Sequence, residues 1–305
     1  MAESDKIKLI KEVTDNQVGK PLKDATNNAA PTKSNGFVSE ALDEDVKINE
    51  LATESKPEIT VLIGFEGFGK TSFVASFYHQ FLANDNIGGY KLIDSDTLVG
   101  LERRLFLRRI IGDSKMSPFT RRTLRGEPYL LSFLLNNSEV VGNKLLIISD
   151  RSGEDYSRYA SQRDSMVNDL ALQNADRIIL FVDSSILISP RRLEMLNKYK
   201  DLAENLAYHN MINDQTELDI LFNKIDLIPK NKEKKNKFEE EKSSIIKMLS
   251  SKLGRAFDNT FEAVSNKEND DKLHNVFSHL VSFRSVKKVT MEKVDLDWIK
   301  YVFKL

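Results

Sequence analysis

The feature that most constrains this chain is the segment at residues 64–71, GFEGFGKT, which matches the pattern GxxxxGK[ST]. A short β-branched run at residues 59–63 precedes it, and a helical pattern of apolar residues follows it. A glycine-rich turn between a strand and a helix aims successive backbone N–H groups at phosphate oxygens, and the helix adds its positive end. This order therefore predicts a phosphate-binding loop at the carboxyl end of a buried strand.

Two side chains of this loop have a predicted chemical role. Lys70 supplies a compact positive charge near the β- and γ-phosphates, and the Thr71 hydroxyl is a hard oxygen ligand suited to Mg²⁺. Glu66 is unusual, because its carboxylate lies near the phosphates unless it points away or meets a basic partner. The residues expected to form the phosphate site are Gly64, Phe65, Glu66, Gly67, Phe68, Gly69, Lys70, Thr71 and Ser72.

Near-continuous apolar runs, which are typical of strands covered on both faces, recur along the chain. They lie at residues 59–63, 144–150, 177–183 and 218–223, with a weaker fifth run at 261–265. Helical periodicity separates them, for example at 190–211 and 235–253, and it places Phe73, Val74, Phe77, Phe81 and Leu82 on one helix face. The alternation predicts an α/β fold of three layers, a mostly parallel sheet with helices on both faces. Residues 129–135 are expected to add an antiparallel edge strand.

A second motif, DRSG at residues 150–153, follows the run at 144–150. A carboxylate at Asp150 can hold Mg²⁺ through water, and the Gly153 amide can reach a γ-phosphate oxygen. The loop that follows would then sense hydrolysis. The motif is short, and its position after a buried strand gives it weight.

A third motif, NKID at residues 223–226, indicates the base. A carboxylate at Asp226 can accept hydrogen bonds from the guanine N1–H and exocyclic amine, whereas adenine presents the opposite pattern and would leave it unpaired. Asn223 can tie this loop to the phosphate loop, and the stem of Lys224 can cover the base plane.

These three motifs in this order resemble the GTPases of the Ras and translation-factor class. The resemblance implies a P-loop GTPase domain with GTP or GDP and Mg²⁺ as ligands, and with Thr71 and Asp150 at the metal. Ser265, Asn266 and Lys267 resemble the fourth motif of that class, although Asn266 departs from its usual Ser-Ala-Lys. The residues implied to act in hydrolysis are Lys70, Gly153, Glu154 and a switch threonine.

Shorter segments at residues 96–102, 128–131 and 149–154 are similar to the bacterial double-GTPase proteins. Those proteins are associated with conflict and anti-phage gene clusters. This narrower resemblance implies a regulatory switch that acts with a second GTPase or another effector protein.

Two departures from the class bear on catalysis. Glu154 stands where Ras-like proteins have a water-orienting glutamine, so binding is better supported than hydrolysis. Lys70 and Asp150 are eighty positions apart, and the sequence between them includes an insertion at about 86–127, with a predicted helix near 97–111. Because the insertion holds several threonines, it leaves more than one candidate for the switch threonine. Thr123 is favoured over Thr120 and over Thr97.

The insertion is also rich in arginine, at positions 103, 104, 108, 109, 121, 122 and 125. A solvated basic face is the plainest interpretation. The alternatives are an arginine finger supplied in cis from Arg121 or Arg122, or a docking patch for an acidic partner or nucleic acid.

Three regions follow from these patterns. Residues 1–56 are polar with few aromatics and are expected to form a flexible N-terminal arm. Residues 57–285 form the GTPase domain, and residues 286–305 form an apolar C-terminal tail that holds Trp298, the only tryptophan. The tail either packs back on the core or docks on another subunit.

The composition of the chain limits the kinds of ligand and partner that it is expected to bind. The chain has no cysteine, which excludes disulfides and thiolate metal sites and is consistent with a cytoplasmic location. Its net charge of −1 gives no indication of nucleic acid, and no apolar stretch is long enough to span a membrane. His79, His209, His274 and His279 lack a metal-ligand spacing and are expected to be structural or surface residues.

The sequence therefore predicts a GTP-binding regulatory protein that hydrolyses GTP with Mg²⁺ and acts with a protein partner. One alternative is a catalytically inactive GTP-binding scaffold, motivated by Glu66 and Glu154. Another is an ATP-dependent P-loop enzyme, which the motif at 223–226 disfavours.

Overall fold

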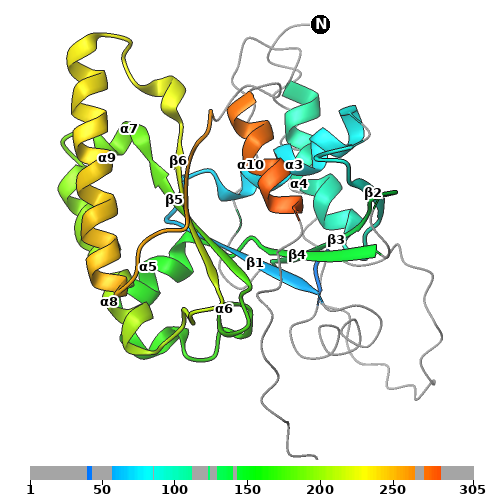
Figure 1. Cartoon of the computed structure of the whole chain (residues 1–305), viewed down its shortest axis with the longest axis horizontal. Helices are drawn as coiled ribbons and strands as arrows, with labels where there is room; N and C mark the ends of the chain where they lie inside the picture. Colours follow the sequence, from blue (N-terminus) through cyan, green and yellow to red (C-terminus); the bar gives the residue numbers. More distant parts are fainter. Residues whose placement is uncertain are drawn as a thin grey trace, which may run out of the picture. The chain divides into compact units, whose positions relative to one another are not determined.

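The computed structural model describes residues 40–42, 57–84, 86–111, 123, 129–139, 143–264 and 271–282. They form a seven-stranded sheet in the order β2-β3-β4-β1-β5-β6-β7 (Figure 1). The strands are β1 (Glu58–Ile63), β2 (Lys91–Asp94), β3 (Leu130–Asn136), β4 (Asn143–Ser149), β5 (Arg177–Asp183), β6 (Glu217–Asn223) and β7 (Asn259–Glu262). Strands β4, β1, β5, β6 and β7 run parallel, so the predicted three-layer α/β fold is confirmed.

The antiparallel part of the sheet differs from the expected arrangement. Strand β3 is antiparallel as predicted, but it lies second from the edge, where it pairs with β4 on one side and β2 on the other. The edge strand is β2, whose four residues are mostly exposed, whereas β3 is largely buried. A short strand with one solvated side carries no apolar run, and the sequence therefore does not indicate it.

Helices cover both faces of the sheet (Figure 1). They are α3 (Lys70–Asn84), α4 (Leu98–Ile111), α5 (Gly153–Ser161), α6 (Leu170–Gln173), α7 (Ser184–Leu187), α8 (Arg192–Tyr208), α9 (Lys232–Leu253) and α10 (Asp271–Val281), with 3₁₀ turns η1 (Arg163–Met166) and η2 (Ile225–Leu227). Helices α3, α4 and α10 lie on one face, and α5, α7, α8 and α9 on the other. In the described residues, no helix combines the length and the apolar character needed to cross a membrane.

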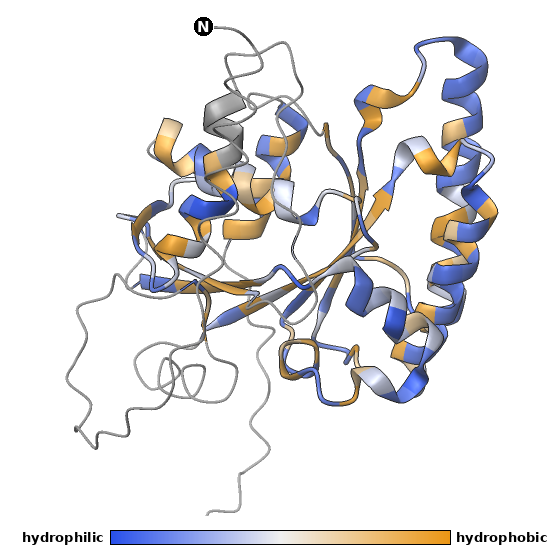
Figure 2. Ribbon diagram, turned by 180° about the vertical axis from the view of Figure 1, so that it is seen from behind, coloured by the Kyte–Doolittle hydropathy of each residue, from blue (hydrophilic) through white to orange (hydrophobic). Residues whose placement is uncertain are grey.

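The core on the α3 face is built from aromatic rings. The Phe77 ring of α3 lies 5.1 Å from Phe133 of β3 and 5.2 Å from Phe277 of α10. Figure 2 shows the strands as mostly hydrophobic and α9 as largely hydrophilic, as expected for a sheet covered on both faces. The predicted apolar face of α3 is wrong at one position, because Leu82 is 50% exposed in the last turn of the helix.

Part of the predicted N-terminal arm lies against the domain. Leu42 is buried, and its N–H donates to the carbonyl oxygen of Leu130 at 2.9 Å. Two residues before it, Glu40 forms an ion pair with Arg103 of α4. Residues 40–42 therefore contact β3 and α4, which corrects the expectation of flexibility for these three residues. The rest of the 1–56 segment and the tail at 286–305 lie outside the described residues, and their boundaries stay predictions.

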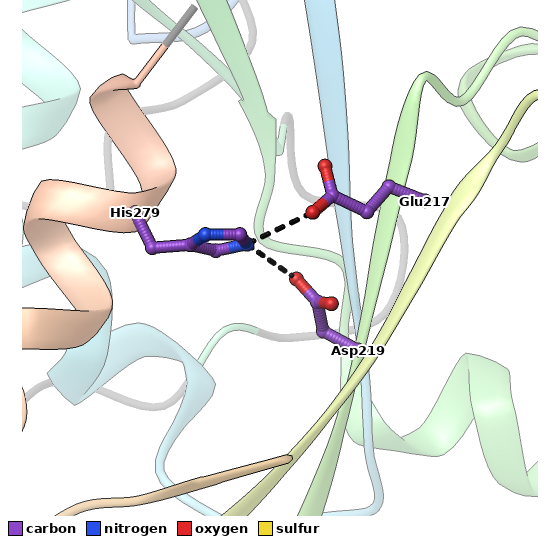
Figure 3. Close-up of side chains that lie close together, drawn as sticks. All are labelled: Glu217, Asp219 and His279. Carbon is purple, nitrogen blue, oxygen red and sulfur yellow. Dashed lines mark hydrogen bonds and ion pairs between the residues drawn. The ribbon is translucent and has the colours of Figure 1, made fainter. Parts of the chain in front are cut away.

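A polar network joins α10 to the amino ends of the central strands. His279 Nε2 lies 3.0 Å from Glu217 Oε1 and 3.1 Å from Asp219 Oδ2 (Figure 3). Asn259 and Arg177 also donate to this carboxylate pair. Hydrogen bonds that His279 donates to Asp219 and Glu217 raise the pKa of His279 to about 9. His279, Asn259 and Arg177 already donate to the carboxylate oxygens of Glu217 and Asp219. The cluster therefore holds α10 against the sheet through ion pairs and hydrogen bonds.

Stability should therefore fall in mildly alkaline solution. The pKa of His279 is about 9 in the folded chain against an ordinary 6.5, so its protonated form favours folding. Burial opposes ionisation of Glu217, but hydrogen bonds from His279 and Arg177 outweigh it and hold that pKa at about 2, so Glu217 stays charged. The histidine's contribution is complete below its ordinary pKa of 6.5 and disappears as pH rises through about 9.

Urea unfolding at several pH values across this window checks that expectation against a His279→Gln variant. Wild type should lose stability as pH rises, and the variant should show a flatter dependence. Parallel curves for the two proteins would contradict a stabilising charge on His279.

Candidate nucleotide-binding site

The predicted motifs meet at one edge of the sheet. Strands β1, β4 and β6 end at Ile63, Ser149 and Asn223, and because they are parallel their carboxyl ends lie together. The loop after β1, residues 64–69, leads directly into α3. Ligands of open α/β sheets bind at this edge. The topology thus gathers residues that are up to 159 positions apart, from Gly64 to Asn223.

Lys70 begins α3 and is held inside the loop. Its ammonium donates to the carbonyl oxygen of Gly64 at 2.6 Å, and the residue is 6% exposed. Burial lowers the pKa of Lys70 to about 8, although the negative charges of Asp150, Asp155 and Glu66 oppose the shift. A buried cation gains from an anionic ligand such as a phosphate, because the ligand supplies counter-charge where water cannot.

The bulky residues of the loop have a packing role. The Phe65 ring lies 5.7 Å from Phe68 and 4.8 Å from Tyr199 of α8, and both phenylalanines are buried. Any contact of Phe65 or Phe68 with phosphate would therefore come from their backbone. The Glu66 side chain is exposed.

Three oxygen-bearing side chains converge beside the loop. Thr71 Oγ1 lies 3.0 Å from Thr123 Oγ1 and 3.1 Å from Asp150 Oδ1, and Thr123 Oγ1 lies 3.2 Å from Asp150 Oδ2. Asp150 is fully buried. Hard oxygen donors of this kind suit Mg²⁺, so the side chains fit the ion that the sequence predicts.

The geometry separates the candidate switch threonines. Thr123 belongs to the oxygen cluster, whereas Thr97 is buried and accepts a hydrogen bond from the Ser132 N–H at 2.9 Å. Thr97 therefore holds the turn before α4 against β3. Thr120 lies outside the described residues.

Gly153 lies directly against the phosphate loop. A Cβ added there would be 2.2 Å from the Glu66 backbone nitrogen, so only glycine fits without a shift. Gly153 also begins α5, and Ser152 caps that helix by accepting from the Glu154 N–H at 3.2 Å. The Glu154 side chain is exposed in the first turn. The loop predicted to sense hydrolysis therefore leads directly into α5.

The loop after β6 is tied to the phosphate loop. Asn223 Nδ2 donates to the Phe68 carbonyl oxygen at 2.9 Å, and Lys224 donates to the Gly67 carbonyl oxygen at 2.5 Å. Gly69 has a φ of 93°, and a Cβ there would lie 2.2 Å from Asn223 Nδ2. Close approach of the two loops therefore requires this glycine. Asp226 is exposed, three residues after Asn223.

The predicted fourth motif, Ser265, Asn266 and Lys267, lies outside the described residues. The chain just before it is nevertheless placed beside the base loop. Ala263 donates its N–H to the Phe222 carbonyl oxygen at 2.9 Å and accepts from the Ile225 N–H at 3.2 Å. Ser265, the first residue of the motif, follows Ala263 by two positions, and Ala263 is hydrogen-bonded to Ile225, the residue before Asp226.

Two site residues were not assigned by the sequence. Asp183 ends β5, is buried, and accepts from Lys224 Nζ at 2.6 Å, so it positions that lysine. The sequence could have indicated Asp183, because it ends an apolar run in the same way as Asp150 does. Arg104 of α4 donates from Nε to Asp150 Oδ2 at 3.0 Å, which corrects the interpretation of the arginines as a solvated face for this residue. Arg103 is the exposed partner of Glu40.

The side chains of the other insertion arginines, at positions 108, 109, 121, 122 and 125, lie outside the described residues. The alternatives of an arginine finger from Arg121 or Arg122 and of a basic docking patch therefore stay predictions.

Solved structures with detectable likeness are distant in sequence. The bacterial selenocysteine-specific elongation factor EF-Sec is 14% identical, over 68% of this chain and 26% of that chain, with a TM-score of 0.34. A dimerization-deficient variant of Toc33 from Arabidopsis thaliana is 12% identical, over 76% of this chain and 86% of that chain, with a TM-score of 0.39. The chain thus spans about a quarter of the EF-Sec chain. A comparison with curated proteins found no match.

The family assignment comes from a sequence profile. The profile of the Double-GTPase 2 family matches residues 59–282, which is more than half of the 305-residue chain. The matched region begins in β1, includes the phosphate loop, the Asp150 loop and the Asn223 loop, and ends after α10. The chain therefore belongs to the Double-GTPase 2 family and is a P-loop GTPase of the double-GTPase type.

Proposed function

We propose that this chain binds GTP with Mg²⁺, hydrolyses it to GDP and phosphate, and works as a nucleotide-dependent switch. The observation that carries the proposal is the cluster of Thr71, Thr123 and Asp150 oxygens beside the buried Lys70 ammonium. A cation and a hard-oxygen cluster next to a glycine-rich helix N-terminus form a site for a metal-bound polyphosphate.

Each group has a defined role in this proposal. Thr71 and Asp150 hold Mg²⁺, which when bound offsets negative charge on the phosphates. Lys70 would contact the β- and γ-phosphates, and the Thr123 hydroxyl would be a further oxygen ligand for the metal beside Thr71 and Asp150. The Gly153 N–H donates to a γ-phosphate oxygen, which couples the start of α5 to the nucleotide.

Hydrolysis in this site is phosphoryl transfer to water. The water oxygen forms a bond to the γ-phosphorus, and the bond from that phosphorus to the β,γ-bridging oxygen breaks. GDP leaves with the bridging oxygen, and the water proton passes to the released phosphate. Glu154 is proposed to orient the water from the first turn of α5, where its exposed side chain has room to reach it.

Guanine selection is assigned to the loop after β6 and the segment after β7. Asp226 is proposed to pair with the guanine edge, Lys224 to lie along the base, and Asn223 to fix both loops through its bond to Phe68. Ser265, Asn266 and Lys267 are proposed to complete the base site. The hydrogen bond between Ile225 and Ala263 supports this, because it joins the two segments.

The test is GTP turnover by the purified chain with Mg²⁺, measured as GDP formed, with Lys70→Ala as the control. We expect turnover in wild type and a loss of about 100-fold or more in the variant, because an oriented charge on the transferring group contributes at least that much. Turnover that survives in Lys70→Ala would reject this site as the catalytic one.

A second candidate function is a GTP-binding scaffold without turnover. It is favoured by Glu154, because a glutamate stands where Ras-like proteins have a water-orienting glutamine. In this case GTP would co-purify intact and no GDP would accumulate in the same assay. Rapid unassisted turnover would exclude the scaffold.

The wider role is proposed from the family alone. We propose a cytoplasmic switch in a bacterial defence system that acts with a second GTPase or effector protein, with no role assigned to nucleic acid. Phage survival in cells that carry wild type or Lys70→Ala provides the test, and equal survival would count against a nucleotide-dependent defence role.

A further inference from the structure

The side chain of Arg104 reaches the centre of the site from the insertion helix. Its Nε donates to Asp150 Oδ2 at 3.0 Å, and its Nη1 donates to the Gly100 carbonyl oxygen at 3.1 Å. The side chain is 12% exposed and Asp150 is fully buried. Among the described residues, no acceptor contacts Nη2. The guanidinium therefore keeps a pair of N–H donors for another acceptor beside the oxygen cluster.

The Arg104 contact involves the carboxylate that the proposed function assigns to Mg²⁺. Asp150 also accepts from Thr71 at 3.1 Å and from Thr123 at 3.2 Å, so all three donors surround one carboxylate. The Arg104 guanidinium and a Mg²⁺ ion, if bound, would share this one buried carboxylate and would repel each other, since its single negative charge cannot neutralise both. A γ-phosphate at this place supplies the missing negative charge, and its oxygens match the planar fork of a guanidinium.

We propose that Arg104 is an arginine supplied in cis that contacts the γ-phosphate of bound GTP and returns to Asp150 when that phosphate is lost. This inference rests on the proposed function of the same site. It assigns to α4 the task of distinguishing GTP from GDP.

Helix α4 connects this contact to the N-terminal segment. Gly100 packs against the backbone of Glu40, and a Cβ added at Gly100 would lie 1.9 Å from the Glu40 carbonyl oxygen. Arg103, the residue before Arg104, forms the ion pair with the Glu40 side chain. A change in the position of Arg104 is thereby transmitted to residues 40–42 through a single helix turn.

Affinity measurements with Mg²⁺ test the proposal without requiring turnover. The ligands are a non-hydrolysable GTP analogue and GDP, each titrated against wild type, Arg104→Ala, Arg104→Lys and Arg103→Ala. We expect Arg104→Ala to lower affinity for the GTP analogue about 10- to 100-fold and to leave GDP affinity within about threefold, because a charge-assisted hydrogen bond to the γ-phosphate is absent with GDP. Arg104→Lys should recover part of the loss, since it keeps the charge but not the fork.

Arg103→Ala is the matched control, because it removes an arginine from the adjacent and exposed position of the same helix. It should change neither affinity. An analogue-to-GDP affinity ratio that is unchanged in Arg104→Ala, or is lowered equally in Arg103→Ala, would overturn the role of Arg104 alone. A wild-type chain that binds neither ligand would overturn the proposed function and this inference with it. GDP binding by Arg104→Ala shows in the same titration that the variant is folded.

Discussion

Asp226→Asn is expected to change the preferred base from guanine to xanthine. In the proposed site the carboxylate accepts two hydrogen bonds from guanine, and asparagine presents a donor in place of one acceptor. Loss of one charge-assisted bond, and of the charge on the other, corresponds to a fall in GTP affinity on the order of 10³-fold. Xanthine offers a carbonyl oxygen where guanine has its amine, so xanthosine triphosphate should gain affinity in the variant.

Competition binding of GTP, ATP and xanthosine triphosphate to the two proteins measures this change. Asp214→Asn is the control, because Asp214 is also an exposed aspartate but precedes the opposite end of β6. It should keep the wild-type preference. An unaltered preference in Asp226→Asn would refute the base assignment, and equal wild-type binding of ATP and GTP would favour the ATP-dependent alternative.

Arg177→Met is expected to destabilise the fold more than any surface change. Arg177 is 1% exposed at the start of β5, and its guanidinium donates to Glu217 Oε2 at 2.9 Å and to the Leu280 carbonyl oxygen at 2.9 Å. It also lies 3.4 Å from Glu58. Removal of one partner from a buried ion network leaves carboxylates without their counter-charge, which costs about 3–5 kcal/mol of unfolding free energy.

Urea denaturation at neutral pH measures this loss, with Arg191→Met as the control. The Arg191 side chain is 72% exposed and lies 4.0 Å from its partner Glu194, so its removal should cost less than about 1 kcal/mol. We also expect α10 to detach before the remainder of the domain in Arg177→Met, because the Leu280 contact is lost. A destabilisation no larger than that of the control would show that the network does not hold α10 in place.

The sequence was most informative where a short stretch carries the whole signal. The apolar runs predicted β1, β4, β5 and β6 to within one residue at every end, because burial on both faces favours apolar residues along the whole strand. The glycines and Lys70 indicated the phosphate loop for a similar reason, since each acts through its own backbone or charge. The sequence indicates Thr71 and Asp150 as metal ligands, and it favours Thr123 over Thr97 as the switch threonine only because Thr123 lies shortly before the strand that is now β3.

Other features depend on which elements become neighbours. Strand β2 is too short and too exposed to show periodicity, and Leu42 is a single apolar residue in a polar segment. Neither is distinguishable in the sequence from a solvated loop. Their structure depends on which strands become neighbours. Strand β2 forms its hydrogen bonds with β3, and Leu42 is buried where its N–H donates to Leu130 of β3.

The difference between what the sequence predicts and what depends on tertiary neighbours is clearest for the charged side chains. Seven arginines in the insertion look alike in the sequence, and only packing of α4 places Arg104 on Asp150, 46 residues away. Likewise His279 meets Asp219 across 60 residues. The sequence by itself determined the layered fold and the nucleotide motifs, since propensity and burial pattern act locally. Tertiary structure decided which charges are paired, because a charge acts on whatever lies within a few ångströms and that neighbourhood exists only after the sheet is assembled.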